Sequence, residues 1–237
     1  MSVSEKIVFN GHELSASVPD SHVIDISVGS VSIEHNAQAR VINAGSIFIS
    51  KRDTTRTVTI QVELPLGRES ALNNYNLLRA WAESNQPAPL YLPNCDKGYL
   101  QCILSAMGTM PVKSWYEPIE LTFTAYDPYF YGETKTAECG STFTIGGDAL
   151  VDFTISMQNE TALTDPAWTI DGVQKISFTG SIGAGLLLID SSKGLATLAG
   201  QSVMTQLNYE TRFTPLSTGN HTITGSGGTI SWIERWR

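Results

Sequence analysis

The feature that most constrains this chain is a hydrophobic alternation with a period of two residues. Between Thr57 and Leu64, apolar side chains occupy every second position, and threonine, glutamine and glutamate occupy the positions between them. The stretches 119–125 and 151–157 repeat the pattern. Successive side chains of a β-strand point to opposite faces of the sheet, so this period indicates a strand with one buried face. The sequence therefore predicts half-buried strands at these positions.

Shorter β-like runs lie between clusters of Gly, Asn, Asp and Pro, which are residues that favour turns. Short strands separated by turn residues are typical of β-sandwiches and β-barrels. We predict such strands at 28–33, 46–50, 141–145, 175–179, 185–190, 202–209, 220–225 and 229–236. The fold class that follows is mainly β.

The segment from Ser70 to Ser84 departs from the alternation and predicts a helix. Ser70 is a suitable N-cap, and Pro87 and Pro89 prevent the helix from continuing. We expect this amphipathic helix to cover one end or face of the first pair of sheets, with Tyr75 and Trp81 as core anchors rather than ligand contacts. The apolar residues at helical spacing are Ala71, Tyr75, Leu78 and Ala82, with Leu77 and Trp81 beside them.

A change of pattern near 127–140 divides the chain. The segment 127–132 closes a first unit that contains strands and the helix, and Glu133 to Gly140 is mostly small or polar without periodicity. The remainder contains only short strands and most of the turn glycines. We therefore predict two domains, 1–133 and 134–237, each β-sandwich-like and the first carrying the helix.

The charge balance excludes several classes of partner. The 237 residues carry a formal net charge of -8, and the longest basic cluster is Lys51-Arg52. Gripping nucleic acid or an anionic membrane needs clustered Lys and Arg, so neither is expected as a partner. The N-terminus shows no secretory pattern, and no apolar stretch is long enough to span a bilayer. We expect a cytosolic product without membrane insertion.

Motifs for metals, cofactors and catalysis are missing from the sequence. The three cysteines include no CxxC pair, which favours ordinary thiols over a disulfide framework or a zinc site. The histidines, at 12, 22, 35 and 221, show neither HxH nor HExxH spacing, and no GxSxG elbow or P-loop occurs. The glycine-rich run 180–185 is interpreted as a turn. We predict no catalytic, metal-binding or cofactor-binding residues and no cofactor, and we assign no ligand-binding residues.

Carboxylates offer a weak case for a glycoside hydrolase, which needs only two of them across a sugar bond. Asp165 before proline and Asp171 before glycine are better explained as turn residues, and Asp152 as a solvated side chain on a strand. The candidates considered are Asp148 with Asp152, Asp165 with Asp171, and Glu234.

Tryptophans give a second, different alternative. The second domain contains Trp168, Trp232 and Trp236. An exposed tryptophan ring can stack on a sugar, whereas a buried ring packs in a core or in a subunit contact. Alternation places Glu234 on one strand face between Trp232 and Trp236, which favours an edge or interface strand over a deep core. Carbohydrate binding and core packing both remain open at this point.

Taken in order, several stretches of the chain resemble the distal tail protein family of siphophages. A charged turn enters a strand at 51–62, a helix ends in Leu78-Arg79-Ala80-Trp81 before 89–92, and 124–132 resembles the segment that closes the first domain of the family. The second domain carries the remaining similarity, at 167–172, 186–190, 213–223 and 232–237. The resemblance covers essentially the whole chain.

The resemblance implies a virion protein of the tail tip that is made in the cytoplasm of the host bacterium and is not an enzyme. Its N-terminal part would be a belt domain that forms a homo-hexameric ring, and its C-terminal part a galectin-like β-sandwich outside the ring. The ring would join the tail tube protein to the tail-tip hub or baseplate, offer docking surface to host-adsorption and receptor-binding proteins, and let DNA pass through its lumen. Galectins bind sugar through HxNPR, whereas this chain has only Asn220-His221. The alternative is a carbohydrate-binding module that contacts the host surface through the second domain.

Overall fold

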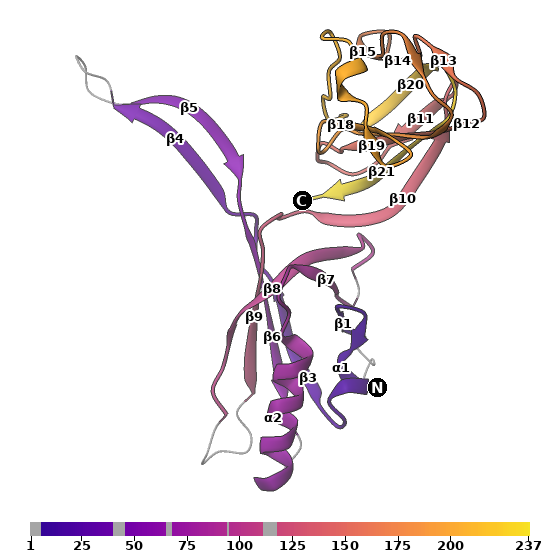
Figure 1. The fold of residues 1–237 in the computed structure, drawn as a ribbon. Coiled ribbons are helices and arrows are strands. Elements are labelled where there is room, and N and C mark those ends of the chain that lie inside the picture. Colours follow the sequence, from indigo (N-terminus) through magenta and orange to yellow (C-terminus); the bar gives the residue numbers. More distant parts are fainter. Residues whose placement is uncertain (1–5, 40–45, 65–67, 94, 111–117) are drawn as a thin grey trace. The chain divides into compact units, whose positions relative to one another are not determined.

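The computed structural model describes residues 6–39, 46–64, 68–93, 95–110 and 118–237. Antiparallel strands dominate it, as the alternation predicts (Figure 1). The chain divides into two compact units, of which the first comprises Met1–Phe130 with Arg237 and the second Tyr131–Trp236. Each unit has its own buried core, and each is described by itself below.

Unit 1 is built on a sheet with the strand order β2-β1-β7-β8-β9-β6-β3. The first half of β8 pairs with β7, and its second half pairs with β9 across an irregularity between Leu104 and Ala106. The long strand therefore belongs to two sheet segments and bends from one into the other. The strands are β1 (Val8–Phe9), β2 (His12–Glu13), β3 (His22–Val28), β6 (Arg56–Glu63), β7 (Ala88–Tyr91), β8 (Tyr99–Met107) and β9 (Ile119–Ala125).

The core of unit 1 forms from the strands whose alternation is most regular. Val58, Ile60 and Val62 on β6 are fully buried, and the apolar residues of β9 face the same core. The predicted strands at 57–64 and 119–125 are therefore confirmed, although Leu64 lies beyond the end of β6 and is only half-buried.

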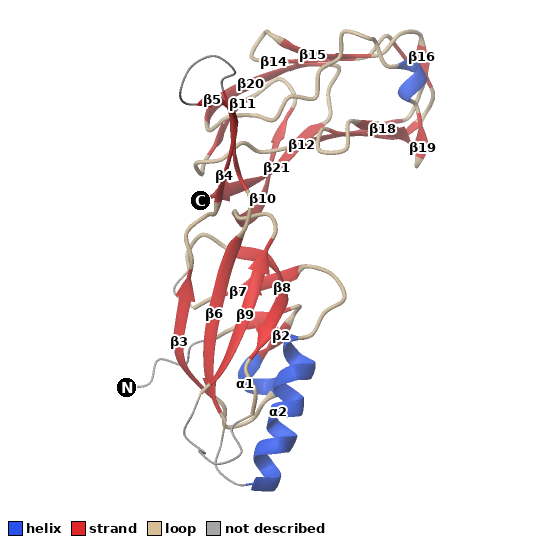
Figure 2. Ribbon diagram, turned by 90° about the vertical axis from the view of Figure 1, so that its left-hand side faces the viewer, coloured by secondary structure: helices blue, strands red, loops and turns tan. Residues whose placement is uncertain are grey.

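Helix α2 (Arg68–Ala82) covers the sheet of unit 1 (Figure 2). It begins at Arg68, so Ser70 lies inside the first turn and the prediction that Ser70 is the N-cap was wrong. Leu78 and Ala82 are fully buried. Trp81 packs edge-on against Phe9 and Phe123. A second, short helix that the sequence did not predict, α1, spans Leu14–Ser17. No helix in the described part of the chain is long and apolar enough to cross a membrane.

Strands β4 (Ile33–Ala39) and β5 (Ser46–Asp53) form a separate antiparallel hairpin. It continues the ladder of β3 and β6, because Gly29 donates to Thr57 and the backbones of Ser32 and Thr54–Thr55 are hydrogen-bonded to each other. The predicted single strand at 28–33 was wrong, since 29–32 is the connection between β3 and β4. This short connection joins the β3–β6 strand pair to the β4–β5 pair.

Unit 2 has two main sheets that enclose a core, which is the sandwich arrangement that the turn-rich sequence favours, and a separate two-stranded sheet of β13 and β16 (Figure 2). The first sheet has the order β19-β18-β17-β12-β21-β10 and the second β11-β20-β14-β15. Its strands are β10 (Phe130–Glu138), β11 (Thr142–Ile145), β12 (Phe153–Asn159), β13 (Leu163–Thr164), β14 (Ala167–Ile170), β15 (Gln174–Ser177), β16 (Ser181–Ile182), β17 (Gly185–Asp190), β18 (Leu195–Leu198), β19 (Gln201–Ser202), β20 (Gly219–Gly225) and β21 (Thr229–Trp236), with a 3-10 helix at Met204–Gln206.

Two expectations for unit 2 need correction. Residues 133–140 are not an irregular segment, because β10 extends to Glu138; its side chains at 133–136 are exposed, which removes the alternation from the sequence. The run 202–209 is not a strand either, since only Gln201–Ser202 is extended and the 3-10 helix follows. The predicted strand at 151–157 is confirmed for Phe153–Asn159, and Val151 instead forms an isolated bridge with Leu216.

Candidate interaction surface

The side chains considered for catalysis or metal binding do not converge. Among the described residues, no group of three or more His, Cys, Asp or Glu side chains is placed to hold a metal ion. His12, His22 and His35 are exposed on β2, β3 and β4, whereas His221 is buried on β20. Of the carboxylates considered for a glycosidase, Asp165, Asp171 and Glu234 are engaged in separate structural contacts.

Asp165 and Asp171 both serve turns, as the sequence predicts. Each adopts a left-handed backbone conformation, with φ of 48° and 54°. Asp165 Oδ1 accepts a hydrogen bond from the backbone N–H of Gly180 at 2.6 Å, and Asp171 Oδ1 accepts one from Thr222 at 2.8 Å. Short carboxylates that bond to nearby or cross-strand amides are typical turn residues.

Next to that turn, the buried side chain of His221 contacts the exposed carboxylate of Asp171. Nδ1 of His221 lies 2.7 Å from Asp171 Oδ2, and Nε2 lies 2.7 Å from the carbonyl oxygen of Ser217. Each ring nitrogen of His221 therefore lies within hydrogen-bond distance of an oxygen atom. Partial burial acts to raise the pKa of Asp171, but the bonds from Thr222 and His221 outweigh it and lower that pKa. Because both its nitrogens are occupied, His221 is not available to bind a sugar.

Glu234 is a buried structural carboxylate. Its Oε1 accepts from Lys135 Nζ at 2.6 Å and from the backbone N–H of Gly146 at 2.8 Å. Burial acts to raise the pKa of Glu234, but these two contacts together lower it below its usual value. The side chain lies on the inward face of β21, between β12 and β10 in the sheet order. The expectation that Glu234 marks an edge or interface strand was therefore wrong. The ion pair with Lys135 offsets the free-energy cost of burying the Glu234 carboxylate.

Two of the three tryptophans considered in unit 2 belong to the interior. Trp168 is fully buried and its Nε1 donates to Gly227 at 2.7 Å, while Trp232 is 4% exposed. Trp236 is half-buried, and a Cβ on Gly132 would come within 2.6 Å of its ring. Buried rings cannot stack on a sugar, so Trp168 and Trp232 do not support the carbohydrate-binding alternative.

All three cysteines are free thiols, as the sequence predicts. Burial raises the pKa of Cys102 to about 12, against a smaller lowering effect of Arg56, so this thiol stays protonated. Burial also raises the pKa of Cys139. Cys95 is half-buried and lines a groove described below.

The β4–β5 hairpin of unit 1 exposes several large apolar side chains to solvent. Every side chain described at 33–38 and 48–52 is exposed. Phe48 is 61% exposed, Ile49 53% and Ile33 47%. An isolated two-stranded hairpin is marginally stable in water, and grouped exposed apolar side chains mark interaction sites. The hairpin is therefore a candidate interaction surface.

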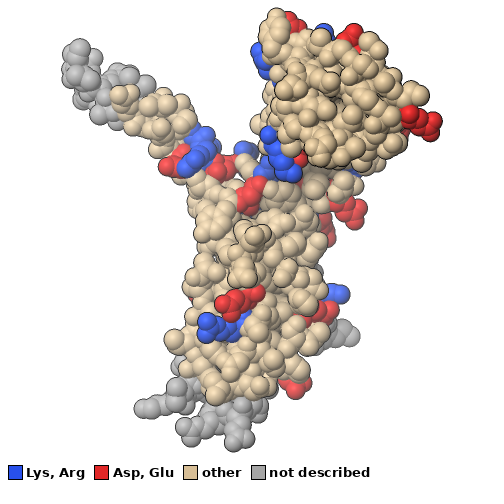
Figure 3. Space-filling model, in the orientation of Figure 1, with Lys and Arg blue, Asp and Glu red and all other residues tan. Residues whose placement is uncertain are grey.

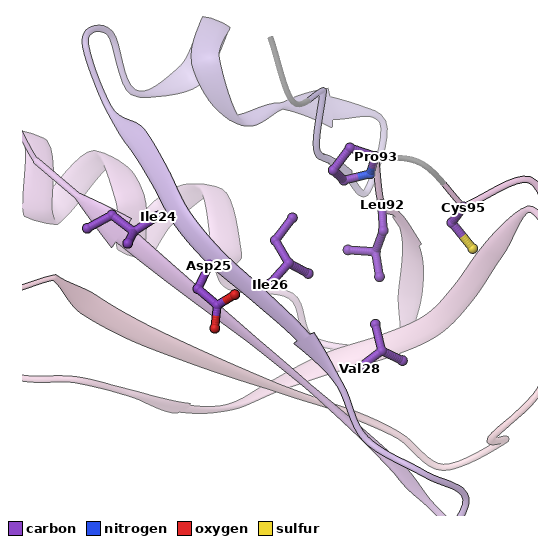
Figure 4. A pocket seen from close by; sticks show the side chains of 7 residues that line it. All are labelled: Ile24, Asp25, Ile26, Val28, Leu92, Pro93 and Cys95. Atoms are coloured by element: carbon purple, nitrogen blue, oxygen red, sulfur yellow. The ribbon is translucent and has the colours of Figure 1, made fainter. Parts of the chain in front are cut away.

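A shallow groove of about 400 Å³ lies along β3 (Figure 4). Within the described residues, β3 pairs with β6 alone, so its other edge leaves backbone groups unpaired in the sheet. Ile24 and Val28 on this strand are 52% and 42% exposed. The lining residues are Ile24, Asp25, Ile26 and Val28 from β3 and Leu92, Pro93 and Cys95 from the segment after β7.

Neither surface was assigned from the sequence. The run Ile47-Phe48-Ile49 does indicate an exposed apolar side chain. Successive side chains of a strand alternate between its two faces, so three apolar residues in a row place at least one on the face that a half-buried strand exposes. Charged side chains on the face shown in Figure 3 occur in small mixed groups rather than as a continuous basic surface. Apolar contact, rather than chemistry or anion binding, is what this arrangement supports.

Comparison with solved structures shows which fold the chain has. It matches the crystal structure of the phage SPP1 Dit (gp 19.1) protein, which is described as a paradigm of the hub adsorption apparatus of phages that infect Gram-positive bacteria. The TM-score of this match is 0.80 and the sequence identity is 16%, and the match covers 98% of this chain and 99% of that one. It also matches a chain of the phage P2 baseplate in its activated conformation with Ca, with a TM-score of 0.54, 11% identity and 97% of each chain covered. The same baseplate with Sr matches at a TM-score of 0.54 and 10% identity, again over 97% of each chain.

No protein-family model matches the chain, and no curated protein matches it. The likeness in fold nevertheless extends over almost the full length of both chains in each comparison. The chain therefore has the mainly β fold of the Dit protein, and the fold predicted from the resemblance is confirmed.

Proposed function

We propose that this chain is a structural component of a bacteriophage tail tip, a distal tail protein without catalytic activity. The observation that carries the proposal is the likeness in fold to the SPP1 Dit protein over 98% of the chain. Fold alone does not imply function, so the surface must agree with the role. The exposed hairpin and the β3 groove supply apolar contact surfaces that an assembly subunit needs.

The assembly we propose is a homo-hexameric ring in the virion. Residues 1–133 would form the ring, and residues 134–237 would lie outside it as the galectin-like part. A closed ring requires a heterologous interface, in which two different patches of one chain meet on neighbouring copies. The hairpin and the groove are two such patches within unit 1.

The partners we propose follow from that place in the particle. The ring would join the tail tube protein to the tail-tip hub and provide docking for receptor-binding proteins. DNA would pass through the lumen without specific binding, which the formal net charge of -8 favours because like charges repel. No observation on unit 2 favours direct sugar binding by the tryptophans, since Trp168 and Trp232 are buried.

The test is the native mass of the purified chain over a wide concentration range, combined with negative-stain imaging. We expect a six-copy species with a central hole. A chain that stays monomeric at every concentration, and that also fails to assemble on tail tubes, would contradict the ring. Turnover of purified cell-wall polysaccharide by the full chain would contradict the non-enzymatic role.

A further inference from the structure

We propose that His221 operates a proton-dependent clamp inside unit 2. When both ring nitrogens of His221 carry a proton, the ring joins the turn between β14 and β15 to the segment that precedes β20. When only one nitrogen carries a proton, the ring releases that segment. The clamp consists of the His221 ring, the Asp171 carboxylate and the backbone carbonyl of Ser217. It is a regulatory device of unit 2 and does not rest on the proposed ring function.

The ring of His221 is held in place by the sandwich of unit 2. The residue is 6% exposed and lies opposite Phe143 in the register of β20 with β11. The two ring centroids are 5.8 Å apart, with an angle of 32° between the ring planes. Because water has little access to this ring, its nitrogens depend on the protein for hydrogen-bond partners.

The two partners of the ring are both oxygen atoms. Asp171 Oδ2 lies 2.7 Å from Nδ1, and the carbonyl oxygen of Ser217 lies 2.7 Å from Nε2. A carbonyl oxygen and an ionised carboxylate only accept hydrogen bonds. A neutral imidazole has one N–H to donate, whereas an imidazolium has two. The neutral ring therefore leaves one nitrogen lone pair facing an oxygen, and only the imidazolium satisfies both contacts.

The carboxylate of Asp171 is ionised in this arrangement. Its Oδ1 accepts from the backbone N–H of Thr222 at 2.8 Å. Partial burial acts to raise the pKa of Asp171, but the hydrogen bonds from Thr222 and His221 outweigh that effect and lower the pKa. The proton that completes the clamp therefore resides on the His221 ring rather than on the carboxylate.

The contact that the neutral ring gives up is the one with Ser217. A hydrogen bond to a charged acceptor is stronger than one to a neutral carbonyl, so the remaining N–H stays with Asp171. Leu216, just before Ser217, exchanges two backbone hydrogen bonds with Val151, at 2.8 and 2.9 Å. Residues 217–219 are exposed and lie between this anchor and β20. Loss of the proton therefore frees a short segment whose two ends stay fixed.

Few other groups of unit 2 complicate the titration. Among the described residues, Asp171 is the charged side chain that contacts His221, while β11 presents Phe143 and the preceding segment presents a backbone carbonyl. The other histidines, at 12, 22 and 35, belong to unit 1. Burial raises the pKa of Cys139, which moves that thiol further from neutral pH. Histidine is the side chain whose charge ordinarily changes between about pH 5 and pH 8.

The sign of the pH dependence follows from where the proton binds. The folded chain uses the proton in two hydrogen bonds, whereas the unfolded chain does not, so stability is greatest at the acidic end of this range and falls as pH rises. We expect the clamp to raise the unfolding equilibrium constant about five- to tenfold between about pH 5 and pH 8. The factor is modest because the Asp171 side chain is 44% exposed.

The decisive variant is Asp171→Asn, which satisfies the same contacts without the extra proton. Its amide oxygen accepts from Thr222 as before, and its amide N–H donates to Nδ1 of a neutral His221. The single ring proton then sits on Nε2 and donates to Ser217. Asparagine also tolerates the left-handed backbone at this position, where φ is 54°. The variant should therefore fold, and its stability should not depend on the protonation of His221.

Asp165→Asn is the matched control. Asp165 also has a left-handed backbone, with φ of 48°, and its carboxylate accepts from the N–H of Gly180 instead of contacting a histidine. The measurement is urea unfolding of the full chain at one protein concentration, at a series of pH values between about 5 and 8. The chains differ at one position each, so the three histidines of unit 1 contribute equally to all of them.

We expect the original chain and Asp165→Asn to lose stability in parallel as pH rises, and Asp171→Asn to lack the five- to tenfold part of that loss, about 1 kcal/mol or more. An Asp171→Asn chain that keeps the original pH dependence overturns the clamp. So does an Asp165→Asn chain that loses it to the same extent, or an Asp171→Asn chain that does not fold.

NMR of the backbone carbonyls tests which contact is released. The Ser217 carbonyl resonance should move with pH in the original chain and stay constant in Asp171→Asn. The carbonyl of Val151, which accepts from the N–H of Leu216, serves as the internal reference and should not move in either chain. A Ser217 carbonyl that does not respond to pH in the original chain overturns the inference, whatever the assembly state of the protein.

Discussion

At the residue scale, Asp53 shows how unit 1 holds the base of its hairpin. The carboxylate lies at the end of β5 and is 9% exposed. Its Oδ2 accepts hydrogen bonds from the Tyr129 hydroxyl at 2.8 Å and from Arg237 Nε at 2.9 Å. These bonds, first that from Tyr129 and then that from Arg237, lower the pKa of Asp53 against the opposing effect of burial. The ionised carboxylate is therefore part of the folded state.

This arrangement predicts how stability depends on pH. A carboxyl whose pKa is lowered by folding contributes stability above its unfolded pKa, near 4, and loses it as pH falls through the folded value. Asp53→Asn should lower the free energy of unfolding by about 1–2 kcal/mol at pH 7, a figure reduced because Arg237 is more than half exposed. The variant should also lose less stability than the original chain between neutral and acidic pH.

Urea unfolding at a series of pH values measures both effects. Asp25→Asn is the matched control, because Asp25 makes no ion pair within the described residues. An Asp53→Asn chain with the same acid sensitivity as the original would contradict the role assigned to these hydrogen bonds.

At the element scale, β20 shows how closely the strands of unit 2 approach one another. It lies between β11 and β14 and begins and ends with a glycine of positive φ, Gly219 at 122° and Gly225 at 143°. A Cβ on Gly225 would collide with the carbonyl oxygen of Ala167 and lie 2.7 Å from Trp168 Cα, whereas nothing lies within 4 Å of the corresponding position at Gly219. Both end glycines have a positive φ, but only at Gly225 do other atoms occupy the place of a Cβ.

That difference predicts unequal effects of the same substitution. Gly219→Ala should destabilise unit 2 by about 1–2 kcal/mol through backbone strain alone. Gly225→Ala should destabilise unit 2 by about 1–3 kcal/mol more than Gly219→Ala does, because the backbone of β14 must move to admit the methyl group. Chemical denaturation of both variants gives the comparison. Equal losses would mean that the close approach of β20 to β14 relaxes easily.

At the scale of the whole molecule, the chain contains two units that each bury their own apolar residues. The core of unit 2 is built from both of its sheets and includes Trp168 and Trp232. The core of unit 1 includes Phe9, Leu78 and Phe123. Units with separate cores are able to unfold as separate cooperative transitions.

We therefore expect calorimetry of the monomeric chain to resolve two transitions. Leu78→Ala should lower only the transition of unit 1, at a cost of about 2–5 kcal/mol for the buried cavity. Gly225→Ala should lower only that of unit 2. If either substitution moves both transitions together, the chain unfolds as a single cooperative body.

Much of the architecture was predictable because it depends on local periodicity. The strands at 57–64 and 119–125, the helix with Leu78 and Ala82 inward, and the turn roles of Asp165 and Asp171 all follow from side-chain spacing or turn chemistry. Strand β8 was missed because its halves pair with different strands across a bulge, which breaks the alternation. Strand β10 was missed because a run of its side chains is exposed.

The sequence by itself determined the strands with the most regular alternation, the position of the long helix, and that the chain is mainly β. These properties follow from the period of hydrophobicity and from turn residues, both of which act over a few neighbouring positions. Only the tertiary structure decided that Glu234 and Trp232 are interior, because their partners Lys135 and Phe143 come from distant strands. Within the described part of the chain, it alone also left β3 paired with β6 only and the hairpin exposed, since exposure depends on which strands meet in space.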